Sequence, residues 1–260
     1  MKKKLTVCFL LILIASLSFS QGAKDLYYDM EVGVIENLND TVPQDIQLTN
    51  EAGELVFLKD QIDKPTAIVF VYFRCPGICS PLMDGLADVI QKSDLEIAKD
   101  YQVITISFDP TETYDLAVKK KNNYKSLIKG KNTQEGWKFY TGDSLNIAKA
   151  TKALGFRYKK VGNEYTHAAT VIVTSPDGKI TRYLNGTYFL PFEFKLAMME
   201  ASKGQAGPTI NKILQYCYSY DPVGQAYVLN ITKITGVIIL IMGLIVFLLL
   251  VFVKTKRKQQ

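Results

Sequence analysis

This chain has little histidine and little cysteine, and it has no excess of basic residues outside its two ends. Its 260 residues include one histidine, four cysteines and one tryptophan. A single histidine excludes zinc hydrolase sites that need several imidazoles, and no phosphate-binding glycine loop is present. The formal net charge is +6, but the basic residues of the two termini (Lys2–Lys4 and residues 254–258) contribute +7, which leaves −1 for the rest. The sequence therefore gives no indication of nucleic acid as a partner.

Both ends of the chain have the composition of targeting segments. Residues 1–20 combine three lysines with a short apolar run, which predicts a signal peptide. Residues 234–253 are uncharged and long enough to cross a bilayer as a helix. The basic tail 254–260 is expected in the cytoplasm by the positive-inside rule. We therefore expect a single-pass protein of a bacterial cytoplasmic membrane, with residues 21–233 on the periplasmic side.

Between these ends, the sequence predicts three segments. An extended lead-in rich in turn signals covers 21–45, a globular domain covers 46–202, and a tyrosine-rich juxtamembrane segment covers 203–233. Cys8 would leave with the signal peptide, so three cysteines remain: Cys75, Cys79 and Cys217. An odd count in an oxidising compartment favours a functional pair plus one further thiol over a disulfide scaffold.

The hydrophobic pattern of the globular domain predicts alternating strands and helices. Continuous apolar and β-branched runs indicate buried strands, periods of three and four indicate helices, and the turn SPDG (175–178) indicates a hairpin. The predicted strands cover 46–48, 55–58, 66–73, 103–108, 169–173 and 180–184, and the predicted helices cover 81–97, 111–128, 143–154 and 192–202. The run Lys119–Lys121 is expected on the solvent face of its helix. From the first central strand (66–73) on, the order β-α-β-α-α-β-β-α predicts an α/β domain with a thioredoxin-like fold and a central mixed sheet.

The segment Cys75-Pro-Gly-Ile-Cys79 follows directly after the first central strand. In helical geometry, cysteines at i and i+4 lie on one face with their Cα atoms roughly 6 Å apart. That separation allows either a disulfide or chelation of one soft metal ion. Pro76 favours a helix start beside Cys75, where unpaired N–H groups stabilise a thiolate. The pair is therefore a redox couple, a metal clamp or both.

His167 precedes the third central strand, in a loop that faces the cysteines in thioredoxin-like folds. That loop usually carries a cis-proline, but this chain has no proline between Pro110 and Pro176. Two thiolates and one imidazole make a three-coordinate soft site that suits Cu(I) and tolerates Cu(II). Cys75, Cys79 and His167 are therefore the candidate metal ligands, and a structural role for the histidine is the alternative.

Three separated motifs resemble the Sco/SenC copper chaperones. They are FVYFRCPGICSPLM (70–83), SFDP (107–110) and YTH (165–167). The resemblance runs from about residue 46 to residue 202. It implies that Cys75, Cys79 and His167 bind one copper ion. It also implies that the protein supports assembly of the binuclear copper site of cytochrome c oxidase, with the copper-receiving subunit as partner and an upstream copper donor or thiol reductant as another.

The sequence departs from that family in two places. Members commonly carry an acid in an Asp-Pro-x-x-Asp pattern, whereas here Glu112 puts the acid one place early. Asp109 is predicted either to support the metal site from behind the ligands or to cap the following helix. Members are often anchored by an N-terminal helix, whereas this chain is expected to use its C-terminus.

Other functions are weighed against copper handling. A thiol–disulfide oxidoreductase is the chief rival, and it would need Cys75 and Cys79 but not His167. A peroxidase is disfavoured because Tyr72 stands where peroxiredoxins place Thr or Ser. Cys217 is expected to be inert or redox-auxiliary, with an extra copper ligand as the alternative.

Overall fold

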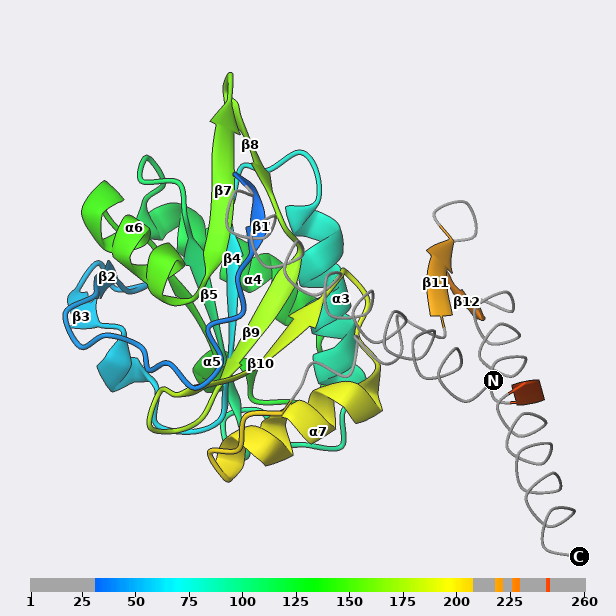
Figure 1. The fold of residues 1–260 in the computed structure, drawn as a ribbon. Coiled ribbons are helices and arrows are strands. Elements are labelled where there is room, and N and C mark those ends of the chain that lie inside the picture. Colours follow the sequence, from blue (N-terminus) through cyan, green and yellow to red (C-terminus); the bar gives the residue numbers. More distant parts are fainter. Residues whose placement is uncertain (1–30, 208–217, 222–225, 230–241, 244–260) are drawn as a thin grey trace, which may run out of the picture. The chain divides into compact units, whose positions relative to one another are not determined.

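The computed structural model describes residues 31–207, 218–221, 226–229 and 242–243 (Figure 1). The chain divides into two compact units, residues 1–207 and 208–260. In the second unit, β11 (Tyr218–Asp221) pairs with β12 (Ala226–Leu229) as an antiparallel hairpin. All candidate site residues except Cys217 lie in the first unit. Cys217 lies outside the described residues.

A five-stranded mixed sheet forms the centre of the first unit. Its order is β10-β9-β4-β5-β6, with β4, β5 and β6 parallel and with β9 antiparallel to both β4 and β10. The strands are β4 (Thr66–Val71), β5 (Gln102–Ser107), β6 (Trp137–Tyr140), β9 (Thr170–Thr174) and β10 (Ile180–Asn185). Every residue of β4 and β5 is buried, which explains their uninterrupted apolar and β-branched sequences. The mixed sheet confirms the predicted α/β class.

The helices cover this sheet. They are α3 (Cys79–Lys92), α4 (Tyr114–Leu127), α5 (Thr133–Gly136), α6 (Ser144–Ala153) and α7 (Pro191–Ser202), with the 3-10 turn η1 (Lys59–Gln61) before β4. Helix α3 contacts both α4 and α7, whereas α6 contacts β7 and β2. The predicted caps of α6 are confirmed. Asp143 accepts a hydrogen bond from the Asn146 N–H at 2.8 Å, and Gly155 ends the helix with a φ of +67°.

A second, smaller sheet was not predicted from the sequence. It has the order β1-β7-β8 and comprises β1 (Gly33–Val34), β7 (Phe156–Val161) and β8 (Glu164–His167). Strand β6 was also missed. The lysines of β7 and the four-residue length of β6 make a weak strand signal, and both strands form because neighbouring elements complete their pairing. The predicted hairpin of β2 (Gln47–Thr49) with β3 (Leu55–Phe57) is present.

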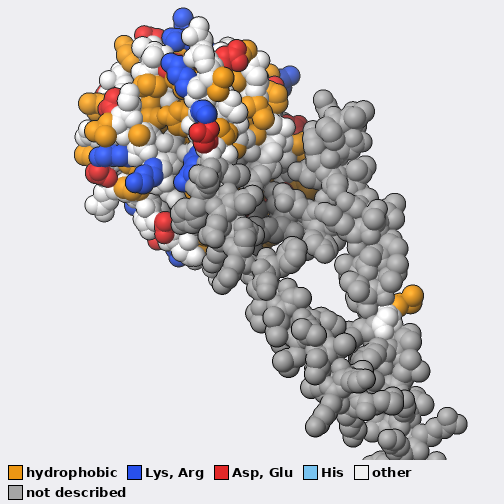
Figure 2. Space-filling view, turned by 45° about the horizontal axis from the view of Figure 1, so that its top comes forward, with side chains coloured by type: hydrophobic (Ala, Val, Ile, Leu, Met, Phe, Trp, Pro, Cys, Tyr) orange, Lys and Arg blue, Asp and Glu red, His pale blue; other side chains and the backbone are white. Residues whose placement is uncertain are grey.

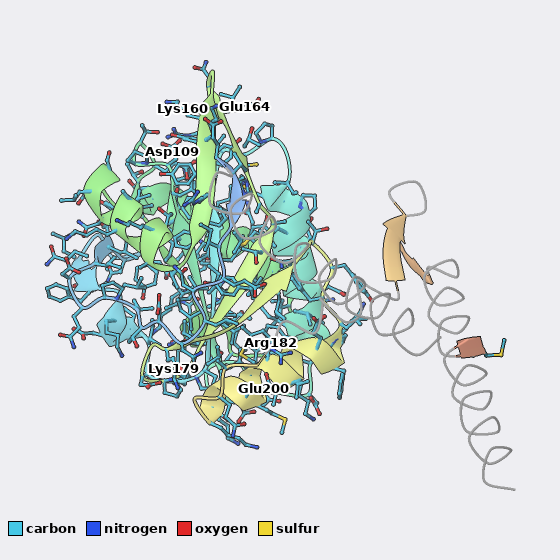
Figure 3. The ribbon with its side chains drawn as sticks, in the orientation of Figure 1. Asp109, Lys160, Glu164, Lys179, Arg182 and Glu200 are labelled. Atoms are coloured by element: carbon cyan, nitrogen blue, oxygen red, sulfur yellow. The ribbon has the colours of Figure 1, made fainter. Side chains whose placement is uncertain are left out.

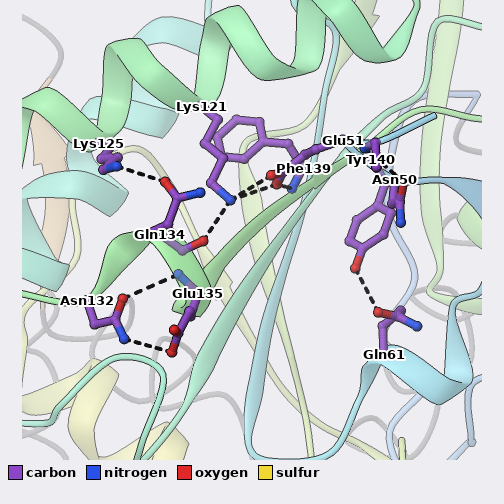
Figure 4. A network of polar contacts seen from close by, with 11 residues as sticks. Asn50, Glu51, Gln61, Lys121, Lys125, Asn132, Gln134, Glu135, Phe139 and Tyr140 are labelled. Carbon is purple, nitrogen blue, oxygen red and sulfur yellow. Dashed lines mark hydrogen bonds and ion pairs between the residues drawn. The ribbon is translucent and has the colours of Figure 1, made fainter. Parts of the chain in front are cut away.

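The expectation that Lys119–Lys121 faces solvent is wrong for Lys121. Its side chain is 6% exposed, and its Nζ donates to both carboxylate oxygens of Glu51 and to the Gln134 carbonyl (Figure 4). Glu51 also accepts a hydrogen bond from the Phe139 N–H at 2.8 Å. The network joins the β2–β3 turn to α4 and β6, so this lysine is part of the packed structure.

The predicted membrane segments are not tested by the described residues. No helix within them is both long and apolar enough to cross a bilayer. Residues 1–20, 254–260 and all but two residues of 234–253 lie outside them. On the face shown in Figure 2, Lys and Arg side chains are interspersed with acidic and apolar ones, without a continuous basic field.

Candidate metal centre

The two cysteines lie where β4 passes into α3. Cys79 is the first residue of α3, and Cys75 belongs to the preceding turn. The predicted helix start beside Cys75 is therefore wrong by about one turn. Proline disfavours helical geometry in the residue before it, and glycine has low helix propensity, so Pro76 and Gly77 delay the helix. The Gly77 N–H instead donates to Cys75 Sγ at 3.3 Å, so a backbone donor still faces this sulfur.

His167 reaches the cysteines from a strand and not from a loop. It is the last residue of β8 and pairs with Tyr158 of β7. Within the described residues there is no cis peptide bond, in agreement with the absence of proline from this segment. The imidazole is therefore fixed by sheet register.

The structure brings Cys75, Cys79 and His167 together. Their two Sγ atoms and one ring nitrogen all lie within 4.8 Å of one another, and the thiols are not joined as a disulfide. His167 Nε2 lies 3.0 Å from Cys79 Sγ. His167 Nδ1 lies 2.9 Å from the Ala168 carbonyl, which can only accept, so Nδ1 carries the proton. Nε2 thus presents its lone pair to the thiols, as a metal ligand requires.

A collar of aromatic rings surrounds the imidazole. Phe108 lies 5.1 Å, Phe156 5.9 Å and Tyr72 6.1 Å from it, measured between ring centroids. Tyr165 packs edge-on against both Tyr72 and Phe108. The alternation of Phe156 with Tyr158, and of Tyr165 with His167, was the sequence signal for this collar. It was missed because strands β7 and β8 were not predicted.

Burial shapes the protonation of these groups. It raises the pKa of the Cys79 thiol well above its ordinary value, and hydrogen bonding to Cys75 adds to the shift. It also lowers the pKa of His167, against the effect of the Ala168 hydrogen bond. Burial and a hydrogen bond with Cys75 together raise the pKa of Tyr72 to about 12. At neutral pH the metal-free pair is therefore a Cys79 thiol beside a neutral imidazole, and a bound metal would displace the thiol proton.

Glu112 anchors the turn that leads to Cys75. It is 4% exposed and accepts three hydrogen bonds: from the Phe73 N–H at 2.7 Å, the Arg74 N–H at 2.8 Å and the Ser107 hydroxyl at 2.6 Å. The two N–H groups belong to the residues directly before Cys75, so this carboxylate fixes the backbone that leads into Cys75. Sequence reasoning noted Glu112 only as a displaced acid.

The space around the donors suits an ion. The three donor atoms already lie within 4.8 Å of one another. Bonds of roughly 2.0–2.3 Å from a metal to nitrogen and sulfur would put the donors about 4 Å apart. Each donor therefore needs to move by less than about 1 Å to bind one ion, and two soft sulfurs with one imidazole favour copper among the biological metals.

Comparison with known proteins identifies the family. The SCO1/SenC family model matches residues 36–192, more than half of the chain. The chain belongs to the SCO1/SenC family. Among curated relatives of this SCO1/SenC protein, the SCO1 protein homolog of Bacillus subtilis (strain 168) is 25% identical over 196 residues. That match covers 74% of this chain and 91% of the relative.

Two solved structures are similar to this SCO1/SenC protein. The first, from Aquifex aeolicus VF5, is described as a candidate electron transfer protein. It is 32% identical with a TM-score of 0.57, and the match covers 64% of this chain and 95% of the other. The second is BsSco, described as a Sco-family cytochrome c oxidase assembly protein with a disulfide switch. It is 23% identical with a TM-score of 0.51, covering 65% and 98% of the two chains, and it bears on the fold alone.

In this SCO1/SenC protein, Asp109 caps a turn just before α4, which matches the predicted helix-capping role only in part. Its Oδ1 accepts hydrogen bonds from the Thr111 N–H at 2.9 Å and the Thr111 hydroxyl at 2.8 Å, so it caps the turn before α4. The N-cap of α4 itself is Thr113. Burial, followed by the Asp109 charge, raises the pKa of Tyr165 in the aromatic collar. A supporting role behind the metal ligands stays a prediction.

Proposed function

We propose that this protein binds copper through Cys75, Cys79 and His167 and helps to assemble the binuclear copper site of cytochrome c oxidase. The observation that carries the proposal is the convergence of two free thiols and an unprotonated Nε2 within 4.8 Å. Membership of the SCO1/SenC family and the description of BsSco as an oxidase assembly protein support it. Copper is the cargo, and thiolate ligands favour Cu(I).

The three proposed ligands differ in their exposure to solvent, which sets the order in which they would release copper. Cys79 is 4% and His167 7% exposed, whereas Cys75 is only partly buried. In the proposed transfer, a thiolate or imidazole of the acceptor approaches from the Cys75 side and forms a bond to copper as the bond to Cys75 breaks. Cys79 and His167 would release the ion last, because they lie deeper. The oxidation state of copper does not change in this exchange.

The proposed setting is the outer face of a bacterial cytoplasmic membrane. The apolar segment 234–253 would anchor the chain, and the tail 254–260 would stay in the cytoplasm. The copper-receiving oxidase subunit lies in the same membrane in this proposal. An upstream copper donor or a thiol reductant would supply the protein.

The test is an anaerobic Cu(I) titration of the full chain against a chromophoric chelator, with His167→Ala measured beside the wild type. We expect one tightly held copper per wild-type chain and an affinity at least tenfold weaker in the variant, since one of three ligands is lost. Thr166→Ala, the neighbouring residue on the exposed side of β8, is the matched control and should bind like the wild type. Equal binding by wild type and His167→Ala would refute the three-ligand site.

A thiol–disulfide oxidoreductase is the second candidate. It is supported by the proximity of the two free thiols and by the disulfide switch described for BsSco. Here the Cys75 and Cys79 thiols would reduce a disulfide of the acceptor, become a disulfide themselves with loss of two electrons and two protons, and be restored by a thiol reductant. Equal disulfide reduction by wild type and His167→Ala, together with poor copper binding by both, would favour this function.

A further inference from the structure

Helix α7 is apolar on its outward face as well as on its inward face. Phe194, Ala197, Met198 and Ala201 point into the core and are buried. Phe192 and Met199, at i and i+7, are 75% and 45% exposed, and Leu196 between them is half-buried. A helix with apolar residues on two opposite faces is normally covered on both. Within the described residues, nothing buries this outer stripe.

The residues leading into α7 extend the apolar surface. Tyr188 is 56% and Leu190 48% exposed. Their loop is pressed against α3 at Gly85, where a Cβ would lie 1.8 Å from the Thr187 carbonyl oxygen. This close backbone packing fixes the segment that carries Tyr188 and Leu190 against α3, directly before α7 begins. Exposed apolar side chains gathered in this way mark an interaction surface.

We propose that the outer face of α7, defined as Tyr188, Leu190, Phe192, Leu196 and Met199, lies in the interfacial region of the membrane. Two features select a bilayer over a protein partner. The predicted anchor 234–253 would begin about thirty residues after α7 ends, and a flexible linker of that length spans roughly 30 Å, so it can place the end of α7 at the lipid surface. The exposed Lys203 lies at the end of the apolar stripe, and a lysine beside an apolar face suits anionic headgroups; Lys195, on the side of the stripe, is already paired with Asp94. Glu200 does not oppose this, because it forms an ion pair with Arg182 of β10.

The proposal fixes the orientation of the metal centre. Figure 3 shows Asp109, Lys160 and Glu164 at one end of the first unit and Arg182 and Glu200, beside α7, at the other. Helix α3 connects these ends. It starts at Cys79, and the Asp94–Lys195 ion pair just beyond its last residue ties it to α7. Fourteen residues of helix span about 21 Å, so the metal centre would face away from the bilayer, open to a partner's extramembrane domain.

The experiment places a fluorescent reporter on each end of the full-length protein in phosphatidylcholine–phosphatidylglycerol vesicles. Phe192→Trp and Met199→Trp report on the α7 face. Val161→Trp, at a residue 57% exposed at the tip of β7, is the matched control. The wild type supplies the background, because its single tryptophan, Trp137, is buried. Lipids brominated in the acyl chains then quench tryptophans that enter the interface.

We expect most of the added fluorescence to be lost at positions 192 and 199 and retained at 161. No quenching at 192 and 199 would overturn the proposal, and so would a blue shift without quenching, which indicates a protein partner or a second copy. Quenching at only one of the two would exclude a helix lying flat. Failure of the chain to float with the vesicles would overturn it as well. Copper titration of the same variants is expected to be unchanged, so loss of this proposal leaves the proposed copper function separately testable.

Discussion

Two acids, the buried Glu112 and the partly buried Glu51, each hold a turn of the first unit, and they do so by different chemistry. Glu112 fixes the turn before Cys75 with three N–H and O–H donors and no cation among its hydrogen-bond partners. Glu51 fixes the β2–β3 turn with the Lys121 ammonium and one N–H. The Glu112 charge is one contributor, after burial, to the raised pKa of Cys79, whereas the Glu51 charge is paired with Lys121.

We infer from this difference that Glu112 positions the metal site, whereas Glu51 contributes to the stability of the fold. Hydrogen bonds from neighbouring backbone N–H groups fix a carboxylate and a chain segment in one geometry, so Glu112 determines where Cys75 lies. An ion pair through a long lysine side chain tolerates small displacements. The Glu51–Lys121 contact therefore joins elements without defining the site. The following substitutions test that separation.

The largest effect is expected for Glu112→Gln. The amide keeps the size of the side chain, but its NH₂ group must face one of the N–H donors of Phe73 or Arg74. We expect the free energy of unfolding to fall by about 3 kcal/mol, because hydrogen bonds to a charged acceptor are lost in a buried place. Cu(I) affinity should fall about tenfold as the turn before Cys75 loosens. Urea unfolding followed by Trp137 fluorescence and the chelator competition measure the two effects.

Glu164→Gln is the matched control for Glu112→Gln. It makes the same chemical change at an exposed acid on the hairpin that carries His167. Its effect on unfolding should stay within about 0.5 kcal/mol, and its copper affinity should match the wild type. Wild-type copper affinity in Glu112→Gln would show that Glu112 stabilises the fold without positioning the site.

Lys121→Met should change stability alone. It leaves the Glu51 carboxylate with one N–H donor. Because the Glu51 side chain is 25% exposed, we expect a loss of about 2 kcal/mol, less than for a fully buried pair. Copper affinity of the folded protein should be unchanged. The double variant Glu51→Gln/Lys121→Met should recover part of the loss, and a weakened copper site in the single variant would contradict the separation.

Ser107→Ala removes one of the three donors to Glu112. The Ser107 hydroxyl is buried and also accepts a hydrogen bond from the Asp109 N–H at 3.2 Å. We expect the free energy of unfolding to fall by about 1 kcal/mol, the usual contribution of one hydrogen bond. Copper affinity should change less than twofold, because the two N–H groups before Cys75 keep their acceptor. A tenfold loss of Cu(I) affinity in the chelator competition would show that Ser107 positions the site.

The sequence predicted the elements whose signals are local. The apolar runs of β4 and β5, the caps of α6 and the SPDG turn between β9 and β10 all depend on residues near one another in the chain. Strands β6 and β7 were missed because their formation depends on pairing with distant partners. Lys121 was misassigned for the same reason, since its acid, Glu51, lies seventy residues away.

The candidate site was predictable in its donors and not in its surroundings. Two cysteines after a strand and a lone histidine before another were visible in the sequence, and the structure brings their donor atoms together. The aromatic collar and the Glu112 anchor were not predicted. The collar combines residues of β7 and β8 with Tyr72 and Phe108, which directly follow β4 and β5, and the anchor joins the turn before α4 to the turn before Cys75. Such tertiary arrangements leave no periodic trace in the sequence.

Glu193 differs from both Glu112 and Glu51, because within the described residues it has neither the backbone donors of the first nor the lysine partner of the second. Its Oε1 has no hydrogen-bond partner in the described part of the chain, and burial raises its pKa above 4.5, against the attraction of Arg182. A raised folded-state pKa means that the protonated acid is favoured in the folded protein, so the contribution of Glu193 to stability is greatest below about pH 4.5 and is lost as the pH rises through the shifted value. Glu193→Gln stays uncharged and should lack this decline. Urea unfolding of both metal-free proteins between about pH 4 and pH 8 measures it. The gap in the free energy of unfolding should open as the pH rises, and parallel curves would show that Arg182 compensates the ionised acid.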